Sequence, residues 1–466
     1  MTRLILIEFN ELCPGLLDNW MAAGYLPNFK DFYERSQVFV TEADETEPVN
    51  LEPWIQWYSI HTGLPYREHG VFHLTDGPRA GHADIWGILH DYGKRVWNCS
   101  SMNSRGFSVP GSAFLPDPWC ASERAHPAEL DLFQRFVAHY VQEYTNPGSS
   151  PCLRDQAQFV SFMATHGLRL GTVSAIVRQL AAELVGSGRT KWRRVSLLDK
   201  LQFDLFRYFF RRLRPDFSSF FVNSTAHLQH AYWRHMEPEA FSVRPSPKEV
   251  DQYQGAILYG YREMDRLLGE FVALAGRDTK LIFATALSQQ PYTKYESIGG
   301  HRFYRPRDVA GLFAMLGISA EKVLPVMTHQ YLAHFSDDAK VAEAREKLSR
   351  LTLDGKSVIG FDLSEAKTLY FGNQLHTLVE PSSRILVADG SGRSFQFDEI
   401  FYRIEEIKSG RHHPQGCLWI RTGAHNRYVE MASILDILPT VLDMYGLPID
   451  RYAGSSLLAR SAATTH

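Results

Sequence analysis

The chain has 466 residues, which is enough for two average domains or for one large α/β domain with insertions. Hydrophobic residues at 44% and charged residues at 22% exclude wholesale disorder, and a formal charge of −3 gives no general basis for nucleic-acid binding. Five scattered cysteines without a CxxC pair exclude a disulfide scaffold. We therefore expect a cytoplasmic protein, with no transmembrane segment and of unknown oligomeric state.

The chain opens with a short, continuous apolar run at residues 4–7, which is typical of a buried parallel strand. A loop over residues 10–14 and a helix over residues 15–23 follow, and Gly24 ends the helix. In open α/β sheets the loops at the carboxyl ends of the strands carry the chemistry, so the loop at Asn10 is a candidate site.

The middle of the chain is predicted to be mainly helical. A punctuated segment over residues 46–54 leads into a helix, and residues 101–215 are expected to form a helical cap inserted into the core. Residues 189–214 are basic and carry an aromatic stripe at helical spacing. This stripe is interpreted as packing on the core, with weak membrane-surface contact as the alternative.

Short, mostly apolar runs typical of buried strands occur again at residues 217–222, 281–285 and 417–421. Together with the first strand, these runs predict a central, mostly parallel sheet flanked by helices. We expect residues 1–100 and 216–466 to form this α/β core, with a possible small subdomain at residues 325–410.

Five segments in order resemble the type I phosphodiesterase/nucleotide pyrophosphatase branch of the alkaline phosphatase superfamily. They are LILIEFNELCPGLLDNWMAAGYLPNF, EPVNLEPWIQWYSIHTGLPYREHGV, FFVNSTAHLQHAYWRH, YREMDRLLGEFVALAGRDTKLIFATALS and GRHHPQGCLWIRTG with the closing ILDILPTVLDMYGLPI. The resemblance covers residue 3 to about residue 458. It implies the α/β fold of that superfamily and a site for two divalent metals with a Thr or Ser nucleophile.

The chemistry of that site is mostly replaced in this chain. The family's functional positions fall, in chain order, on Asn10, Asn50, Ala226, His230, Ala286, Leu287 and His412. Only the two histidines keep their residue type. An amide at Asn50 is not a competent nucleophile, and alanine or leucine has no metal-binding atom. The resemblance therefore predicts no bound metal or other cofactor.

The main functional hypothesis is a divergent, metal-independent phosphodiesterase- or phosphatase-like enzyme acting on an anionic small molecule or glycan. His230 and His412 would act as acid and base or bind an oxyanion, with Asn10 and Asn50 beside them. Each of these residues also has a purely structural interpretation, as a core histidine, loop residue or cap.

Further residues are predicted to bind the substrate. His227 and His413 lie next to the family's histidine positions, and His301, Arg302 and Arg305 lie in a basic, glycine-led segment. Arginine and histidine suit a phosphate, sulfate or carboxylate, although a basic surface loop would look the same.

Two alternatives remain open. The first is a non-catalytic relative that binds an anionic ligand or a partner protein. The second is a metal-dependent phosphodiesterase with relocated ligands, drawn from Glu8, Glu11, Glu47 or His227. The sequence does not identify the substrate.

Overall fold

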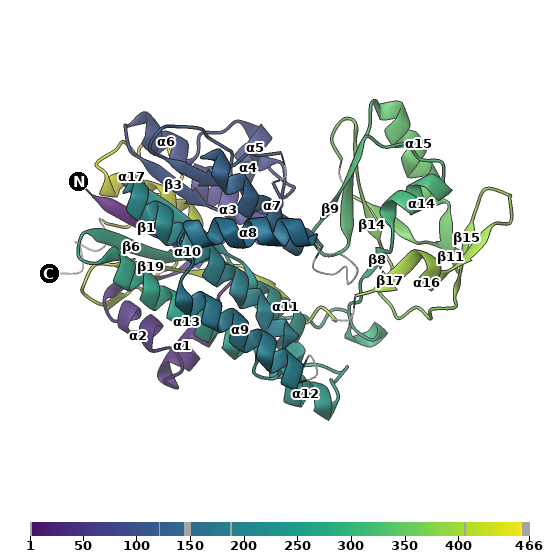
Figure 1. The fold of residues 1–466 in the computed structure, drawn as a ribbon, viewed down its shortest axis with the longest axis horizontal. Coiled ribbons are helices and arrows are strands. Elements are labelled where there is room, and N and C mark those ends of the chain that lie inside the picture. The colour runs from purple at the N-terminus through teal and green to yellow at the C-terminus, as the bar shows by residue number, and fades with distance from the viewer. Residues whose placement is uncertain are drawn as a thin grey trace.

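A computed structural model describes residues 2–120, 122–143, 151–186, 189–362, 364–404 and 407–458. A nine-stranded sheet forms its centre, in the order β20-β2-β19-β6-β1-β5-β3-β4, with β21 beside β2 (Figure 1). The strands are β1 Arg3–Phe9, β2 Ser36–Glu42, β3 Val96–Cys99, β4 Ala113–Leu115, β5 Phe217–Val222, β6 Thr279–Ala284, β19 Gln415–Arg421, β20 Asn426–Arg427 and β21 Ala432–Ser433. All pairings are parallel except those of β19.

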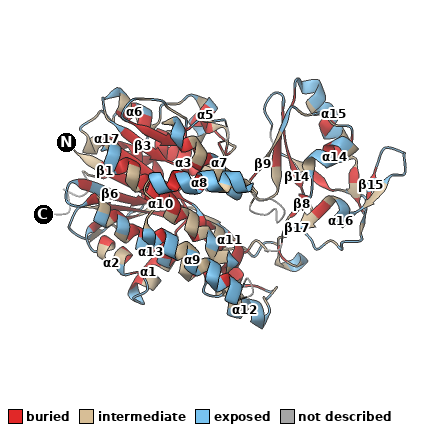
Figure 2. Cartoon of the chain, in the orientation of Figure 1, coloured by how far each residue is buried: buried red, intermediate tan, exposed pale blue. Residues whose placement is uncertain are grey.

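Both faces of this sheet are covered by helices, and its strands are buried (Figure 2). Alternate residues of β1 enter different cores: Ile5, Ile7 and Phe9 pack on one side, and Leu4 and Leu6 on the other. This arrangement explains the continuous apolar run and confirms the predicted fold class.

Helices on the Ile5 side include α1 Pro14–Ala22, α2 Pro27–Tyr33, α7 Asp131–Gln142, α8 Leu153–Thr165, α9 Leu170–Val185, α10 Val195–Leu213, α11 Ser224–Met236, α12 Pro247–Tyr253 and α13 Ala256–Ala275. The Leu4 side carries α3 Pro53–Thr62, α4 Tyr66–His69, α5 Gly77–Ala80, α6 Ile85–Asp91 and α17 Ile437–Met444. Short 3-10 helices lie at Ala128–Leu130, Lys191–Arg194, Pro238–Ala240, Glu296–Ile298 and Ile434–Asp436.

The segment predicted as a cap, residues 101–215, contributes to the main body where it is described. Strand β4 joins the central sheet, and α10 packs on that sheet through Phe203, Phe206 and Phe209, which are fully buried. The aromatic stripe is therefore core, as the sequence interpretation has it, and these phenylalanines are not available for the alternative of membrane contact. In the described part of the chain, no helix is long and apolar enough to cross a membrane.

A smaller lobe follows β6 and has its own hydrophobic core (Figure 1). Its elements are β8 Tyr304–Pro306, α14 Val309–Met315, β9 Lys322–Val326, β10 Gln330–His334, α15 Asp338–Ser349, β11 Leu351–Leu353, β12 Lys356–Ser357, β13 Ile359–Phe361, β14 Thr368–Asn373, β15 Arg384–Val387, β16 Ser394–Gln396, α16 Phe397–Ile400 and β17 Phe401–Arg403. The lobe touches the main body where Tyr370 stacks on His73 with ring centroids 3.9 Å apart.

Between the two lies a two-stranded ribbon formed by β7 (Ser288–Pro291) and β18 (Gly410–His413). The two strands are antiparallel, and His412 lies opposite Gln289. This ribbon leads from the carboxyl end of β6 back to β19, so it holds its residues over the edge of the sheet where the loop after β1 also lies.

Candidate metal centre

Three potential metal ligands converge at the carboxyl end of β1. They are the Glu11 carboxylate, from the loop between β1 and α1, His230 on α11 and His412 on β18, and one ligand atom of each lies within 4.8 Å of the others. Glu11 Oε2 is 3.4 Å from His230 Nε2 and 3.7 Å from His412 Nε2. Among the described residues, this is the only such group of histidine, cysteine and carboxylate side chains.

The backbone conformation of Glu11 directs its carboxylate toward the two histidines. Glu11 adopts a left-handed conformation with φ 64°, which costs a non-glycine residue about 1–2 kcal/mol. The loop is held by buried hydrogen bonds: Gln229 Nε2 donates to the Glu11 carbonyl at 2.8 Å, and the Cys13 amide donates to the Tyr261 hydroxyl at 2.6 Å. A strained residue that its surroundings hold in place is typical of a functional site.

Two amide side chains orient the Glu11 carboxylate. Asn10 Nδ2 donates to Oε1 at 2.7 Å, and Gln289 Nε2 donates to Oε2. Asn10 is itself fixed, because its Oδ1 accepts a hydrogen bond from the Trp57 indole at 2.8 Å. Such supporting donors fix a carboxylate before a cation binds it.

The ring nitrogens of both histidines face this carboxylate. His230 Nδ1 donates to the Gly410 carbonyl oxygen at 2.9 Å, because a carbonyl oxygen only accepts hydrogen bonds, and this contact leaves Nε2 as the ring nitrogen that faces Glu11. His412 also presents its Nε2 atom to Glu11. Carboxylate oxygen and imidazole nitrogen are established zinc ligands.

The charge states also suit a cation. Burial raises the pKa of Glu11, but the His412 and His230 rings and the Gln289 amide outweigh it and hold this pKa at about 2. Burial lowers the pKa of His412 to about 3, against the opposing effect of Glu11. At neutral pH the carboxylate is charged and the His412 ring is neutral, which are the forms that bind metal.

A second carboxyl group lies on the other side of His412. Glu52 Oε2 is 3.4 Å from His412 Nδ1, and Glu52 directly precedes α3. Burial raises the pKa of Glu52 to about 8, although Lys408 opposes this rise. Glu52 therefore holds a proton at neutral pH and can donate it.

The motif positions Ala286, Leu287 and Ala226 carry no metal-binding side chain. Ala286 and Leu287 are fully buried, and Leu287 packs with Ala43 and Leu51 in a small apolar cluster. Ala226 is also buried and offers only its carbonyl oxygen, which accepts a hydrogen bond from Gln289 Nε2 at 3.0 Å. The donor set thus fits one cation and does not fit two.

The remaining predicted site residues lie elsewhere. Asn50 is half-buried, and its side chain donates to Glu45 at 3.1 Å. His227 lies one turn before His230 on α11. His413 Nδ1 accepts a hydrogen bond from the Gln415 amide at 3.2 Å. None of the three is part of the converging group. The sequence analysis had named Glu11 only as an alternative ligand.

The predicted basic segment is divided by the fold. Arg305 is buried, and its guanidinium donates to Tyr331, Gln142 and Glu143, so its charge is used inside the protein. His301 lies instead on a surface shared with other histidines. Arg302 lies beside it, and its backbone amide donates to the His376 carbonyl.

Of the other alternative ligands, Glu8 is fully buried and occupied by His61, at 2.8 Å, and by Ser101, at 2.7 Å. Glu47 is exposed.

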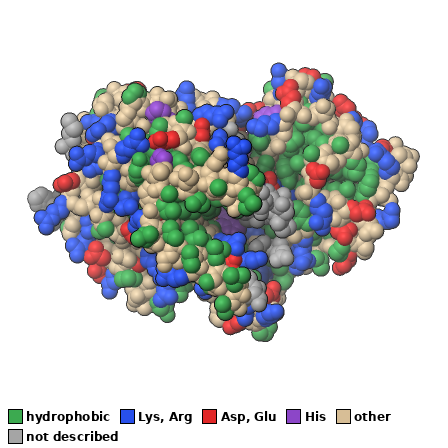
Figure 3. Space-filling view, in the orientation of Figure 1, with side chains coloured by type: hydrophobic (Ala, Val, Ile, Leu, Met, Phe, Trp, Pro, Cys, Tyr) green, Lys and Arg blue, Asp and Glu red, His purple; other side chains and the backbone are tan. Residues whose placement is uncertain are grey.

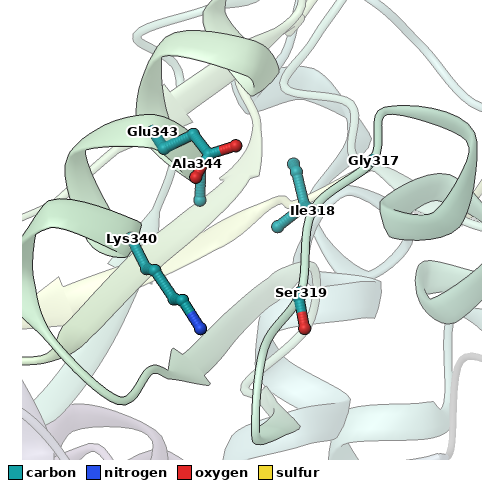
Figure 4. Close-up of a pocket in the computed structure, with 6 residues that line it drawn as sticks. All are labelled: Gly317, Ile318, Ser319, Lys340, Glu343 and Ala344. Atoms are coloured by element: carbon teal, nitrogen blue, oxygen red, sulfur yellow. The ribbon is translucent and has the colours of Figure 1, made fainter.

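A separate pocket lies within the small lobe, between α15 and the loop after α14 (Figure 4). Its one carboxylate, Glu343, is paired with Lys347 at 2.6 Å, so this pocket offers no comparable ligand set.

No protein-family model matches this chain, and no curated protein matches it in sequence. Solved structures do match. Phosphonoacetate hydrolase from Sinorhizobium meliloti 1021 is 14% identical, with 94% of each chain covered and a TM-score of 0.42. Murine ectonucleotide pyrophosphatase/phosphodiesterase 5 is 10% identical, with 97% of this chain and 98% of that chain covered and a TM-score of 0.41.

This likeness is distant, with identities of 14% and 10% and TM-scores of 0.42 and 0.41. At these identities it does not extend to substrate or activity.

Proposed function

We propose that this protein is a phosphoester hydrolase that uses a single divalent cation held by Glu11, His230 and His412. The observation that carries the proposal is the convergence of these three ligand atoms within 4.8 Å. It favours the alternative of relocated ligands over a metal-independent histidine pair. Glu11 supplies the carboxylate that Ala226 lacks.

A cation bound there would supply Lewis-acid polarisation of the ester and activation of water. The protein's own residues do the rest. Asn10 and Gln289 hold the carboxylate, and the Gly410 carbonyl fixes the His230 tautomer. Because Asn50 stands at the nucleophile position, no phosphoenzyme ester forms and water is the attacking group. Glu52, beside His412, is the group that gives a proton to the leaving oxygen, and the proton that the attacking water gives up returns to the Glu52 carboxylate, so that the turnover balances.

The test is metal binding by the intact chain, purified without a metal-affinity tag. We expect about one zinc or manganese ion per chain by mass spectrometry of the elements, and hydrolysis of bis(p-nitrophenyl) phosphate that a chelator abolishes. Glu11→Gln, His230→Ala and His412→Ala should each weaken zinc binding at least tenfold. His413→Ala is the matched control, because its ring is adjacent in sequence but outside the group.

Each other outcome selects a different function. Turnover that persists in EDTA and depends on both histidines would support the metal-independent enzyme. Bound metal without turnover of any phosphoester would support a non-catalytic binding protein. Two metal ions per chain would contradict the apolar filling around Leu287.

A further inference from the structure

Three loops at the base of the small lobe bring three histidines together. His301 follows the 3-10 helix Glu296–Ile298, His329 ends the turn between β9 and β10, and His376 lies in the loop after β14. His301 Nε2 is 3.0 Å from His376 Nδ1. The Phe303 ring stacks on His329 and lies tilted against His301, with ring centroids 4.6 and 4.4 Å away. Of these three histidines, the sequence analysis had named only His301.

This group is surrounded by positive charge. Burial lowers the pKa of His301 and of His329 to about 3, and His376 and then the positively charged Lys408 lower both pKa values further. Lys294 also lowers the pKa of His301, and the Nζ atoms of Lys408 and Lys294 lie over the rings of Tyr292 and Tyr295, which contact His301. The Nδ1 atom of His301 is buried and has no hydrogen-bond partner. A buried, unpaired ring nitrogen among cations is unfavourable until an anion binds.

Lys408 links this group to the candidate metal centre. Its backbone amide donates to the His301 carbonyl, and the next amide, of Ser409, donates to the His230 carbonyl at 2.8 Å. The Lys408 charge also acts on the pKa of His412 and of Glu52. The histidine group and the metal ligands are thus adjacent along residues 408–412, and one lysine influences both.

A second metal centre does not explain these histidines. Their ring nitrogens do not converge as those of His230 and His412 do, since only Glu11, His230 and His412 form such a group among the described residues. His301 Nε2 already faces His376, and two lysines next to the rings would repel a cation. Lysine and imidazole N–H groups are suitable donors to phosphate oxygens.

We propose that His301, His329, His376 and Lys408 form a subsite that binds a phosphate-like anionic group on the part of the substrate that does not react. As a subsite for the substrate, it rests on the hydrolase function proposed above. The substrate class would be a phosphodiester that carries a second phosphoryl group. The small lobe then selects the substrate, and the main body holds the reacting ester.

The test uses the intact protein in EDTA, so that the candidate metal centre contributes nothing. Inorganic phosphate is titrated by calorimetry, and the ring nitrogens are followed by NMR. We expect saturable binding at millimolar phosphate or below, with shifts of the His301 and His376 rings. Lys408→Gln and the double variant His301→Gln/His376→Gln should each bind at least tenfold more weakly. Lys280→Gln, at an exposed position on β6, is the control for charge alone.

Glu11→Gln separates the two proposals. It should lose zinc and keep phosphate binding, whereas Lys408→Gln should lose phosphate binding and keep zinc. Wild-type protein that does not bind phosphate, or Lys408→Gln that binds it as tightly as Lys280→Gln does, would overturn the subsite. If the double variant fails to fold, Lys408→Gln alone decides, because Lys408 is half-buried and has no carboxylate within ion-pair distance among the described residues.

Discussion

The two halves of the candidate site have opposite chemistry. On one side Glu11, His230 and His412 face one another with amide groups holding the carboxylate; on the other, Leu287 packs with Ala43 and Leu51. A carboxylate left alone in the second half would be an unpaired buried charge, which costs several kcal/mol. The difference shows that the polar half can hold a buried charge because hydrogen-bond donors surround it, whereas the apolar half cannot.

The largest effect is expected from returning a charge to the filled half. Leu287→Asp should lower the free energy of unfolding by about 4 kcal/mol, because the carboxylate is buried with no partner and the apolar contacts are lost. Chemical denaturation measures this loss. Leu287→Met keeps the volume and should cost less than about 1.5 kcal/mol.

Added zinc should not rescue Leu287→Asp, because Leu287 packs with the apolar side chains of Ala43 and Leu51 and is not part of the converging ligand group. An aspartate variant as stable as the methionine variant, or one that gains a second zinc ion, would show that the second half of the site is intact.

The next effect concerns the residues that hold the first half. Asn10→Ala removes the donor to Glu11 Oε1, so zinc should bind about tenfold to 100-fold more weakly, as measured by competition with a chelating dye. Asn50→Ala is the matched control, since the Asn50 side chain is half-buried and donates to Glu45, outside the converging group. It should change zinc affinity less than about twofold and stability by no more than about 0.5 kcal/mol. Equal effects of the two substitutions would mean that Asn10 has no positioning role.

The fold was largely predictable because each core strand is a continuous run of mostly apolar residues in the sequence. Residues 4–7, 217–222, 281–285 and 417–421 fall on β1, β5, β6 and β19, which are four consecutive strands of the sheet. Their spacing along the chain does not reveal that β19 runs antiparallel to β6. That direction depends on the ribbon of β7 and β18, which is held by tertiary contacts.

The site was only partly predictable. Motif positions placed His230 and His412 together, and the structure brings their ring centroids to 5.2 Å. They also placed the loop residue at Asn10, whereas the side chain facing the histidines is that of Glu11. The signal that decides between the two is a backbone angle, the positive φ of Glu11, and residue type does not encode it. His329 and His376 lie in unrelated loops, so no spacing pattern identifies them.

The smallest expected effect is the pH dependence of stability, which separates the two kinds of site. The pKa values of His301 and His329, lowered to about 3 by burial and nearby cations, lie below the ordinary value of 6.5. The unfolded chain therefore binds more protons, and the stability from the neutral rings is present above pH 6.5 and lost as the pH falls toward 3. Solvent reaches these half-buried rings and weakens the effect.

The free energy of unfolding of the metal-free protein is measured by urea denaturation between pH 7.5 and 4.5. It should fall less steeply with pH in His301→Gln/His329→Gln than in wild type. In Leu287→Met it should fall as steeply as in wild type, because nothing in the cluster around Leu287 titrates. Phosphate should reduce the wild-type loss, since a bound anion favours the protonated rings, and an identical slope with and without phosphate would contradict the anion subsite.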